Sequence, residues 1–200
     1  MEIFVLASIL SAAYITFLVI LEVLRRKFGY SPELTRRLVH IVSGISTLVD
    51  FLLLPSPWFL ALISISLVGI AASQYFGWLT SVHKVKRRTF GEVFLPVGTL
   101  STWAITQGDA KLFVPSLLIM TFADAAAGIV SDILHAKRKV WQGSAVFFAV
   151  AFAILFVYVA NPFSAIIVAL GVTAVERLSP YGSDNASVPI ASAALLLLAL

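Results

Sequence analysis

Four carboxylates are candidates for chemistry because each lies within or beside an apolar stretch: Glu92, Asp124, Glu176 and Asp184. Asp124 is the most unusual, since alanines surround it in the middle of an apolar run. A carboxylate at such a position is costly in a membrane and is a functional candidate by default. The alternative is a structural partner for a nearby arginine or serine. Carboxylates are also the oxygen ligands that hold Mg²⁺.

The Asp124 segment continues as TFADAAAGIVSD, in which Asp124, Gly128 and Asp132 follow one another at intervals of four. On a helix this spacing places the three residues on one stripe. Small residues around them allow close helix packing. Asp132 lies near the end of the apolar run, and an ion pair with Lys137 would explain it equally well.

Glu92 stands in the stretch KRRTFGEVFLPVG, directly before an apolar run. A carboxylate at a helix start is favoured by the helix dipole, which is the structural explanation. Pro96 and Gly98 follow within two turns, and Pro-x-Gly in a short apolar segment predicts a broken helix that lines a cavity. We therefore count Glu92 with the functional carboxylates.

The stretch ERLSPYGSDNASVP, residues 176–189, is a polar connection between two apolar segments near the end of the chain. Pro180 and Gly182 are turn residues that hold such a loop in one conformation. Asp184 adds a carboxylate, and Ser183 and Asn185 add hydrogen-bonding groups for a nucleotide or a metal-bound water. We expect this loop to form one wall of a catalytic site, in which Asp184 and Asn185 face Asp124 and Glu92 across a nucleotide-sized gap.

Basic residues could supply the anion-binding part of the same site. RRLVHIVSG puts Arg37, His40 and Gly44 about one turn apart on nearly one helix face. This pattern also fits a basic helix end at the membrane surface with an interfacial histidine. The functional interpretation is an arginine that binds phosphate and a histidine just inside the membrane.

Two further basic runs contribute Arg88 and Lys139, although charge runs of this kind are common beside membranes. Gly143 and Ser144 follow the second run at the start of an apolar segment. Backbone N–H groups at a helix N-terminus can bind phosphate, so Gly143 is a further candidate.

The composition places all these residues in an integral membrane protein. Of the 200 residues, 60% are hydrophobic and 12% are charged, whereas a soluble domain is about half apolar and about a quarter charged. Cysteine is absent, which excludes disulfides and thiolate chemistry. The chain contains no soluble stretch long enough to fold alone, so residues 1–200 form one membrane domain.

Apolar stretches predict an all-α polytopic bundle of about eight membrane segments, some short or broken, with seven as the alternative. The first has basic residues after it rather than before it and is long enough to span a bilayer, which favours a retained helix over a signal peptide. The predicted segments are residues 3–24, 38–54, 58–79, 93–106, 112–134, 145–159, 163–175 and 188–200.

Lysine and arginine gather in every second connection. The loops near residues 25–37, 83–92, 135–142 and 176–187 carry the basic residues, and the intervening loops have only Lys111. Cytoplasmic loops carry such an excess, so both termini should lie outside and all four polar loops in the cytoplasm.

These residues together suit one kind of reaction at the lipid boundary. Carboxylates bind Mg²⁺, and basic residues with backbone amides bind phosphates. The sequence has neither a P-loop nor an HExxH motif, which argues against a Walker-type nucleotide site and a zincin. The combination fits phosphoryl or nucleotidyl transfer to a lipid head group, with a soluble nucleotide arriving from the cytoplasm.

The successive blocks RRLVHIVSG, RRTFGEVFLPVG, ADAAAGIVSD, KVWQGS and ERLSPYGSDNASVP resemble those of the CTP-dependent lipid-alcohol kinases. That family includes dolichol, phytol and farnesol kinases and the yeast-type diacylglycerol kinase, and is related to the phosphatidate cytidylyltransferases. The resemblance runs through residues 36–189, which would be the catalytic core, and leaves residues 1–24 as an extra N-terminal helix.

The resemblance implies transfer of the γ-phosphate of CTP to the hydroxyl of a membrane lipid alcohol, such as an isoprenoid alcohol or diacylglycerol. Asp124, Glu92 and Asp184, followed by Glu176, would hold Mg²⁺ or act as the base. The triphosphate would be neutralised by Arg37, Arg88 and Lys139. Either His40 or Asp124 would accept the proton of the alcohol, and the sequence does not choose between them.

Three other functions remain open at this point. A cytidylyltransferase would attack the α-phosphate of CTP and make a CDP-lipid, but its Lys-Asp and Asp-Arg signature is not matched. A transporter should be polar throughout its depth, whereas ionisable residues here concentrate on one side. A non-enzymatic assembly subunit would use the polar loops to bind a partner. The acceptor lipid and the oligomeric state cannot be read from the sequence.

Overall fold

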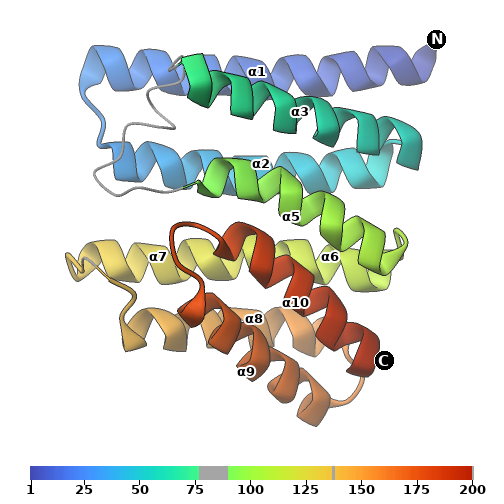
Figure 1. Cartoon of the computed structure of the whole chain (residues 1–200), viewed down its shortest axis with the longest axis vertical. Coiled ribbons are helices and arrows are strands. Elements are labelled where there is room, and N and C mark those ends of the chain that lie inside the picture. The colour runs from blue at the N-terminus through green and yellow to red at the C-terminus, as the bar shows by residue number, and fades with distance from the viewer. Residues whose placement is uncertain (77–89, 137, 200) are drawn as a thin grey trace.

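The structure is a computed structural model that describes residues 1–76, 90–136 and 138–199. All regular secondary structure in these ranges is helical, as Figure 1 shows. The helices are α1 (Glu2–Phe28), α2 (Pro32–Leu53), α3 (Ser56–Phe76), α5 (Gly91–Thr106), α6 (Ala110–Leu118), the π-helical η1 (Ile119–Ala123), α7 (Asp124–Ile133), α8 (Trp141–Tyr158), α9 (Pro162–Leu178) and α10 (Asp184–Ala199).

The prediction of an all-α membrane bundle is confirmed. Because α6, η1 and α7 follow one another without a break, the described ranges contain eight rods, one for each predicted segment. Four of them are long and apolar enough to cross a membrane: α1, α3, the continuous rod Ala110–Ile133, and α8. The others are shorter or less apolar, as the sequence indicated.

Several details of the prediction are wrong; α2, for example, begins at Pro32 rather than at residue 38. The segment with Pro96 is not broken, because α5 runs through it from Gly91 to Thr106. A proline removes one helical hydrogen bond, and neighbouring helices can hold such a helix together in a membrane. The last helix begins at Asp184 rather than at residue 188, and Pro189 lies inside it. A carboxylate in the first turn is favoured by the helix dipole, which supports this earlier start.

The polar connections gather at one end of the bundle. In Figure 1 both termini lie at the same end, and the connections that follow α1, α7 and α9 lie at the other. This arrangement agrees with the alternation of basic loops along the sequence. Which side of the membrane this end faces stays a prediction.

The C-terminal helices pack most closely where α5 crosses α10. A Cβ added to Gly98 would meet the backbone carbonyl oxygen of Asn185 and would lie 2.7 Å from the Cα of Ala186. Only a glycine allows the two backbones to approach this closely. This crossing fixes the start of α10, and therefore Asp184, relative to α5.

Candidate active site

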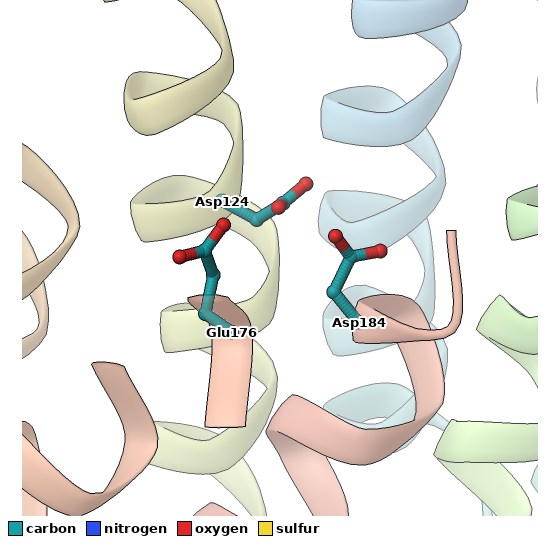
Figure 2. A group of neighbouring side chains, drawn as sticks. All are labelled: Asp124, Glu176 and Asp184. Atoms are coloured by element: carbon teal, nitrogen blue, oxygen red, sulfur yellow. The ribbon is translucent and has the colours of Figure 1, made fainter. Parts of the chain in front are cut away.

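Three of the four predicted carboxylates meet at the polar end of the bundle. Asp124 is the first residue of α7, Glu176 lies in the last turn of α9, and Asp184 is the first residue of α10. One carboxylate oxygen from each lies within 4.8 Å of the others, and Figure 2 shows the three side chains converging from separate helices. We call these three residues the acidic cluster.

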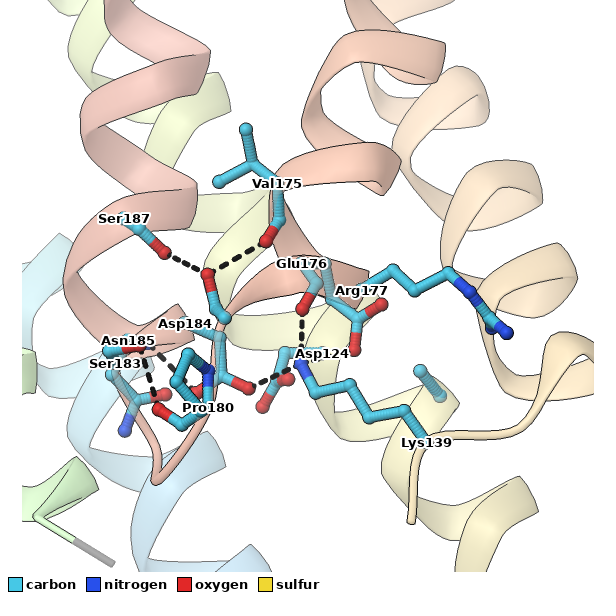
Figure 3. Close-up of polar contacts among 12 residues, drawn as sticks. Asp124, Lys139, Val175, Glu176, Arg177, Pro180, Ser183, Asp184, Asn185 and Ser187 are labelled. Atoms are coloured by element: carbon cyan, nitrogen blue, oxygen red, sulfur yellow. Dashed lines mark hydrogen bonds and ion pairs between the residues drawn. The ribbon is translucent and has the colours of Figure 1, made fainter.

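Lys139 is the cation of this cluster. Its Nζ lies 2.6 Å from Glu176 Oε1 and 2.8 Å from Asp184 Oδ2, and it also donates to the backbone carbonyl oxygen of Glu176 (Figure 3). Burial alone would lower the pKa of Lys139, but the charges of Asp184 and Glu176 raise it above the ordinary value. The lysine therefore stays charged and holds two of the carboxylates together.

The cluster has the donor set that a divalent cation needs. Lys139 forms ion pairs with Glu176 and Asp184, and one carboxylate oxygen from each of the three acidic residues stays close enough to share a single cation. Glu176 Oε2 is buried and has no hydrogen-bond partner in the described part of the chain. A buried oxygen of this kind is costly unless something binds it. Oxygen ligands held this closely fit Mg²⁺, which binds one or two carboxylates together with phosphate oxygens.

The loop of residues 179–183 makes several hydrogen bonds within itself and to the start of α10. The hydroxyls of Ser179 and Ser187 lie 2.6 Å apart, so the start of the loop is joined to the first turn of α10. Ser183 donates to the carbonyl oxygen of Pro180 at 2.7 Å, so its hydroxyl stabilises the loop in this structure. Tyr181, with a φ of 55°, adopts the left-handed conformation that side chains seldom occupy. Such conformations concentrate at functional sites.

Asn185 joins two blocks that are distant in sequence. Its side-chain amide donates to the carbonyl oxygen of Gly91 at 2.7 Å, and the backbone N–H of Phe90 donates to Tyr181 at 3.0 Å. The start of α5 is thereby fixed to the start of α10. Asn185 acts here as a positioning residue, and it also borders the cavity described below.

Glu92 does not join the acidic cluster. It lines a cavity of about 310 Å³ between α1, α2, α3 and α5. Glu92 Oε2 accepts a hydrogen bond from Gln74 at 3.4 Å, and Oε1 is buried with no hydrogen-bond partner among the described residues. The structure thus separates the four predicted carboxylates into a cluster of three and a single cavity residue.

His40 connects that cavity to the acidic cluster. Its ring borders the cavity, and its Nε2 lies 3.7 Å from Asp124 Oδ2. Nε2 also lies 3.0 Å from the carbonyl oxygen of Met120. Because a carbonyl oxygen only accepts, Nε2 carries the hydrogen in this contact. Met120 belongs to η1, and π-helical turns within α-helices occur frequently at functional sites.

The residues that the sequence spacing placed on one face of α2 pack against those that it placed on one face of α7. From α2, Arg37 forms an ion pair with Asp132, and its guanidinium fills the space beside Gly128 that a Cβ would take. Gly44, two turns further along α2, makes an equally close approach to the side chain of Thr121. Helix α2 is therefore locked to the rod that carries Asp124.

Arg36 is a candidate site residue that the sequence analysis missed. It lines the cavity together with His40 and Glu92, whereas Arg37 is engaged by Asp132. The sequence feature that could have identified Arg36 is its interval of four residues from His40, which places both side chains on one helix face. The prediction for Arg88 falls outside the described residues.

Gly143 lies in the first turn of α8 and is buried against α7. A Cβ added there would lie 3.1 Å from the carbonyl oxygen of Ala127 and 3.3 Å from Ser131 Oγ. The backbone N–H of Ser144 already donates to Val140, and its hydroxyl accepts from Arg177 at 3.2 Å. In this structure Gly143 permits close helix packing; phosphate binding there stays a prediction.

One geometric expectation of the site needs correction. A nucleotide-sized gap between Asp184 and Asp124 would keep their carboxylates well apart, but the two lie within 4.8 Å. The reason is the crossing of α5 and α10, which brings the first turn of α10 against the rod of α7. The space between them suits a metal ion, and a nucleotide would bind beside the cluster.

Fold and site together define an all-α membrane protein with a carboxylate cluster at one end and an adjoining cavity among its helices. The chain is similar to a phytol kinase of Synechocystis sp., with 28% identity over 203 residues, which cover 92% of this chain and 87% of that protein. This similarity supports the resemblance to the lipid-alcohol kinases. No family model matches the chain, and no solved structure matches it significantly.

Proposed function

We propose that this protein is a CTP-dependent kinase that transfers the γ-phosphate to the hydroxyl of a lipid alcohol at the cytoplasmic face of a membrane. One observation carries the proposal. His40 borders a cavity among apolar helices and lies 3.7 Å from Asp124, which belongs to the acidic cluster. A hydroxyl beside His40 would therefore lie next to the groups that can bind a metal–triphosphate complex. The similarity to a phytol kinase supports the same reaction class.

The roles of the residues follow from their positions. Asp124, Glu176 and Asp184 would hold Mg²⁺, which when bound neutralises charge on the phosphates and orients them. Lys139 positions two of these carboxylates. Arg36 borders the cavity and can neutralise the transferring phosphoryl group.

In the reaction, the alcohol oxygen forms a bond to the γ-phosphorus and the bond from that phosphorus to the β-phosphate bridging oxygen breaks. CDP leaves with the electron pair. The His40–Asp124 pair accepts the hydroxyl proton. Phosphoryl transfer needs mainly positioning and charge neutralisation, which these groups can supply.

The test uses the full chain in liposomes with Mg²⁺ and CTP labelled at either the α- or the γ-phosphate. We expect label from the γ-position to appear in the lipid when isoprenoid alcohols or diacylglycerol are supplied, and Asp184→Asn to prevent it. If α-label is transferred to a lipid phosphate instead, the protein is a cytidylyltransferase. If neither label is transferred from CTP, while ATP or GTP supplies phosphate, the proposed donor is wrong.

A further inference from the structure

The cavity beside His40 is elongated along α2. Its α2 wall is polar at intervals of three or four residues, which places these side chains on one face of the helix. They are Arg36, His40, Ser43, Thr47 and Asp50. From His40 to Asp50 the helix rises about 15 Å, which is half the hydrocarbon thickness of a bilayer. A ligand that spans the cavity from His40 to Asp50 must therefore be about 15 Å long.

Helix α1 is part of this cavity, although the sequence analysis placed it outside the catalytic core. Tyr14 lines the cavity, and its hydroxyl lies 2.6 Å from Ser43 Oγ of α2. On the opposite wall, a Cβ added to Gly69 of α3 would meet no atom within 4 Å. Gly69 thus borders open space on the α3 side of the cavity.

Asp50 is the last residue of α2 that lines the cavity, and the first turns of α1 pack on the core. Ala7 is buried, and Leu6 and Ile3 pack against the main hydrophobic core. The rings of Phe4 and Trp58 lie 6.1 Å apart and join α1 to the start of α3. The far end of a bound ligand must therefore lie beside Asp50.

Asp50 is an unusual residue for the end of a hydrocarbon-binding cavity. Its residue exposure is only 9%, and its Oδ1 is buried without a hydrogen-bond partner in the part of the chain that the structure describes. An unpaired polar atom of this kind costs about 1–3 kcal/mol. Thr47 and Ser46 border the cavity next to it. A purely hydrocarbon chain would leave the carboxyl group of Asp50 without a hydrogen-bond partner, whereas a ligand hydroxyl in the cavity could pair with that carboxyl group.

We propose that Asp50 forms a second polar subsite, which binds a hydroxyl about 15 Å from the hydroxyl that reacts beside His40. The proposal rests on the proposed function for the reacting end of the ligand. It specifies the acceptor as a long single-chain lipid with a hydrogen-bonding hydroxyl at or near each end. It also makes α1 part of the acceptor site.

The experiment compares dodecanol with dodecanediol, which has a hydroxyl at each end, as acceptors for the full chain in liposomes. We expect the wild-type protein to use the diol with a KM about tenfold below that of the mono-alcohol, as one additional hydrogen bond allows. Asp50→Leu should remove this preference by raising the KM of the diol, with little change for dodecanol. Partition of each alcohol into the bilayer is the same for both proteins, so the ratio between variants isolates the subsite.

Two variants serve as controls. Asp50→Asn keeps a hydrogen-bonding oxygen and should retain most of the preference for the diol. Asp109→Asn removes a carboxylate from the N-cap of α6, outside the cavity, and should change neither KM. The proposal is overturned if the wild-type protein shows no preference, or if Asp50→Leu keeps it.

A second measurement detects binding of the second hydroxyl at the Asp50 subsite without requiring turnover. Without nucleotide, the thermal unfolding temperature of the protein should rise more with dodecanediol than with dodecanol. Asp50→Leu should abolish this difference. If this result holds but no alcohol is phosphorylated, the kinase function is wrong and the subsite stands. If alcohols are phosphorylated and neither assay distinguishes the diol, the function stands and the subsite is wrong.

Discussion

The C-terminal and N-terminal helices of this bundle are packed very differently. Six of the 16 residues of α10 are buried, whereas α1 buries three of 27. At Gly98 the backbones of α5 and α10 touch, but at Gly69 the wall of α3 faces open space. The acidic cluster belongs to the closely packed part, and the cavity belongs to the loosely packed part.

Under the proposed function, this difference would let one small bundle combine precisely positioned catalytic groups with space for a lipid. Catalytic groups must be held in place to be effective, which favours rigid elements. A ligand needs space, which loosely packed helices provide. Helix α2 lies at the boundary, because Arg37 and His40 contact the rod of α7 while Thr47 and Asp50 line the cavity.

The largest expected effect comes from the closely packed side. Asp124→Asn keeps the size of the side chain but removes the charge that both the metal site and His40 would use. We expect phosphorylation of a lipid alcohol to fall by about 100- to 10,000-fold. The measurement is label transfer from CTP by purified, correctly eluting protein. Asp109→Asn is the control, and near-normal activity of Asp124→Asn would remove Asp124 from the site.

A pair of identical substitutions compares the packing of the two parts directly. Gly98→Ala places a methyl group against the backbone of Asn185 and Ala186, and we expect it to lower the free energy of unfolding by about 1–3 kcal/mol. Gly69→Ala meets no atom and should be close to neutral. Thermal unfolding in one detergent measures both. Equal effects would mean that the two parts do not differ in packing.

Filling the cavity should affect the acceptor without affecting the nucleotide. Gly69→Trp extends a large side chain into the open space, so we expect the KM of long-chain alcohols to rise at least about tenfold. The KM for CTP should stay the same, since the acidic cluster lies outside this cavity. Steady-state kinetics with each substrate varied in turn distinguishes the two. An unchanged acceptor KM would show that the lipid binds elsewhere.

The smallest expected effect concerns the contact between α1 and α2. Tyr14→Phe removes one hydrogen bond to Ser43, and such bonds between membrane helices contribute about 0.6 kcal/mol on average. We expect a correspondingly small decrease in stability, measured by thermal unfolding, with little change in turnover. A loss of several kcal/mol would contradict the view that α1 is loosely attached.

Much of the site could be anticipated from residue types, but its grouping could not. Asp124, Glu176 and Asp184 were all candidates, and the structure brings them together. Glu92 was grouped with them because it too is a carboxylate at a helix start, yet it lies in the cavity. The position of Glu92 depends on the direction that the first turn of α5 faces. No local sequence pattern determines that direction.

The sequence by itself determined the helices, because backbone polar groups in lipid must be paired within a segment and every long apolar run therefore becomes helical. It also determined the two stripes on α2 and α7, since spacing along one helix fixes which residues share a face. Only the tertiary structure decided that these stripes meet, that Arg36 rather than Arg37 borders the cavity, and that α1 forms one of its walls. These features depend on how helices cross, and crossings are set by close contacts such as that of Gly98 with Asn185, between residues far apart in the chain.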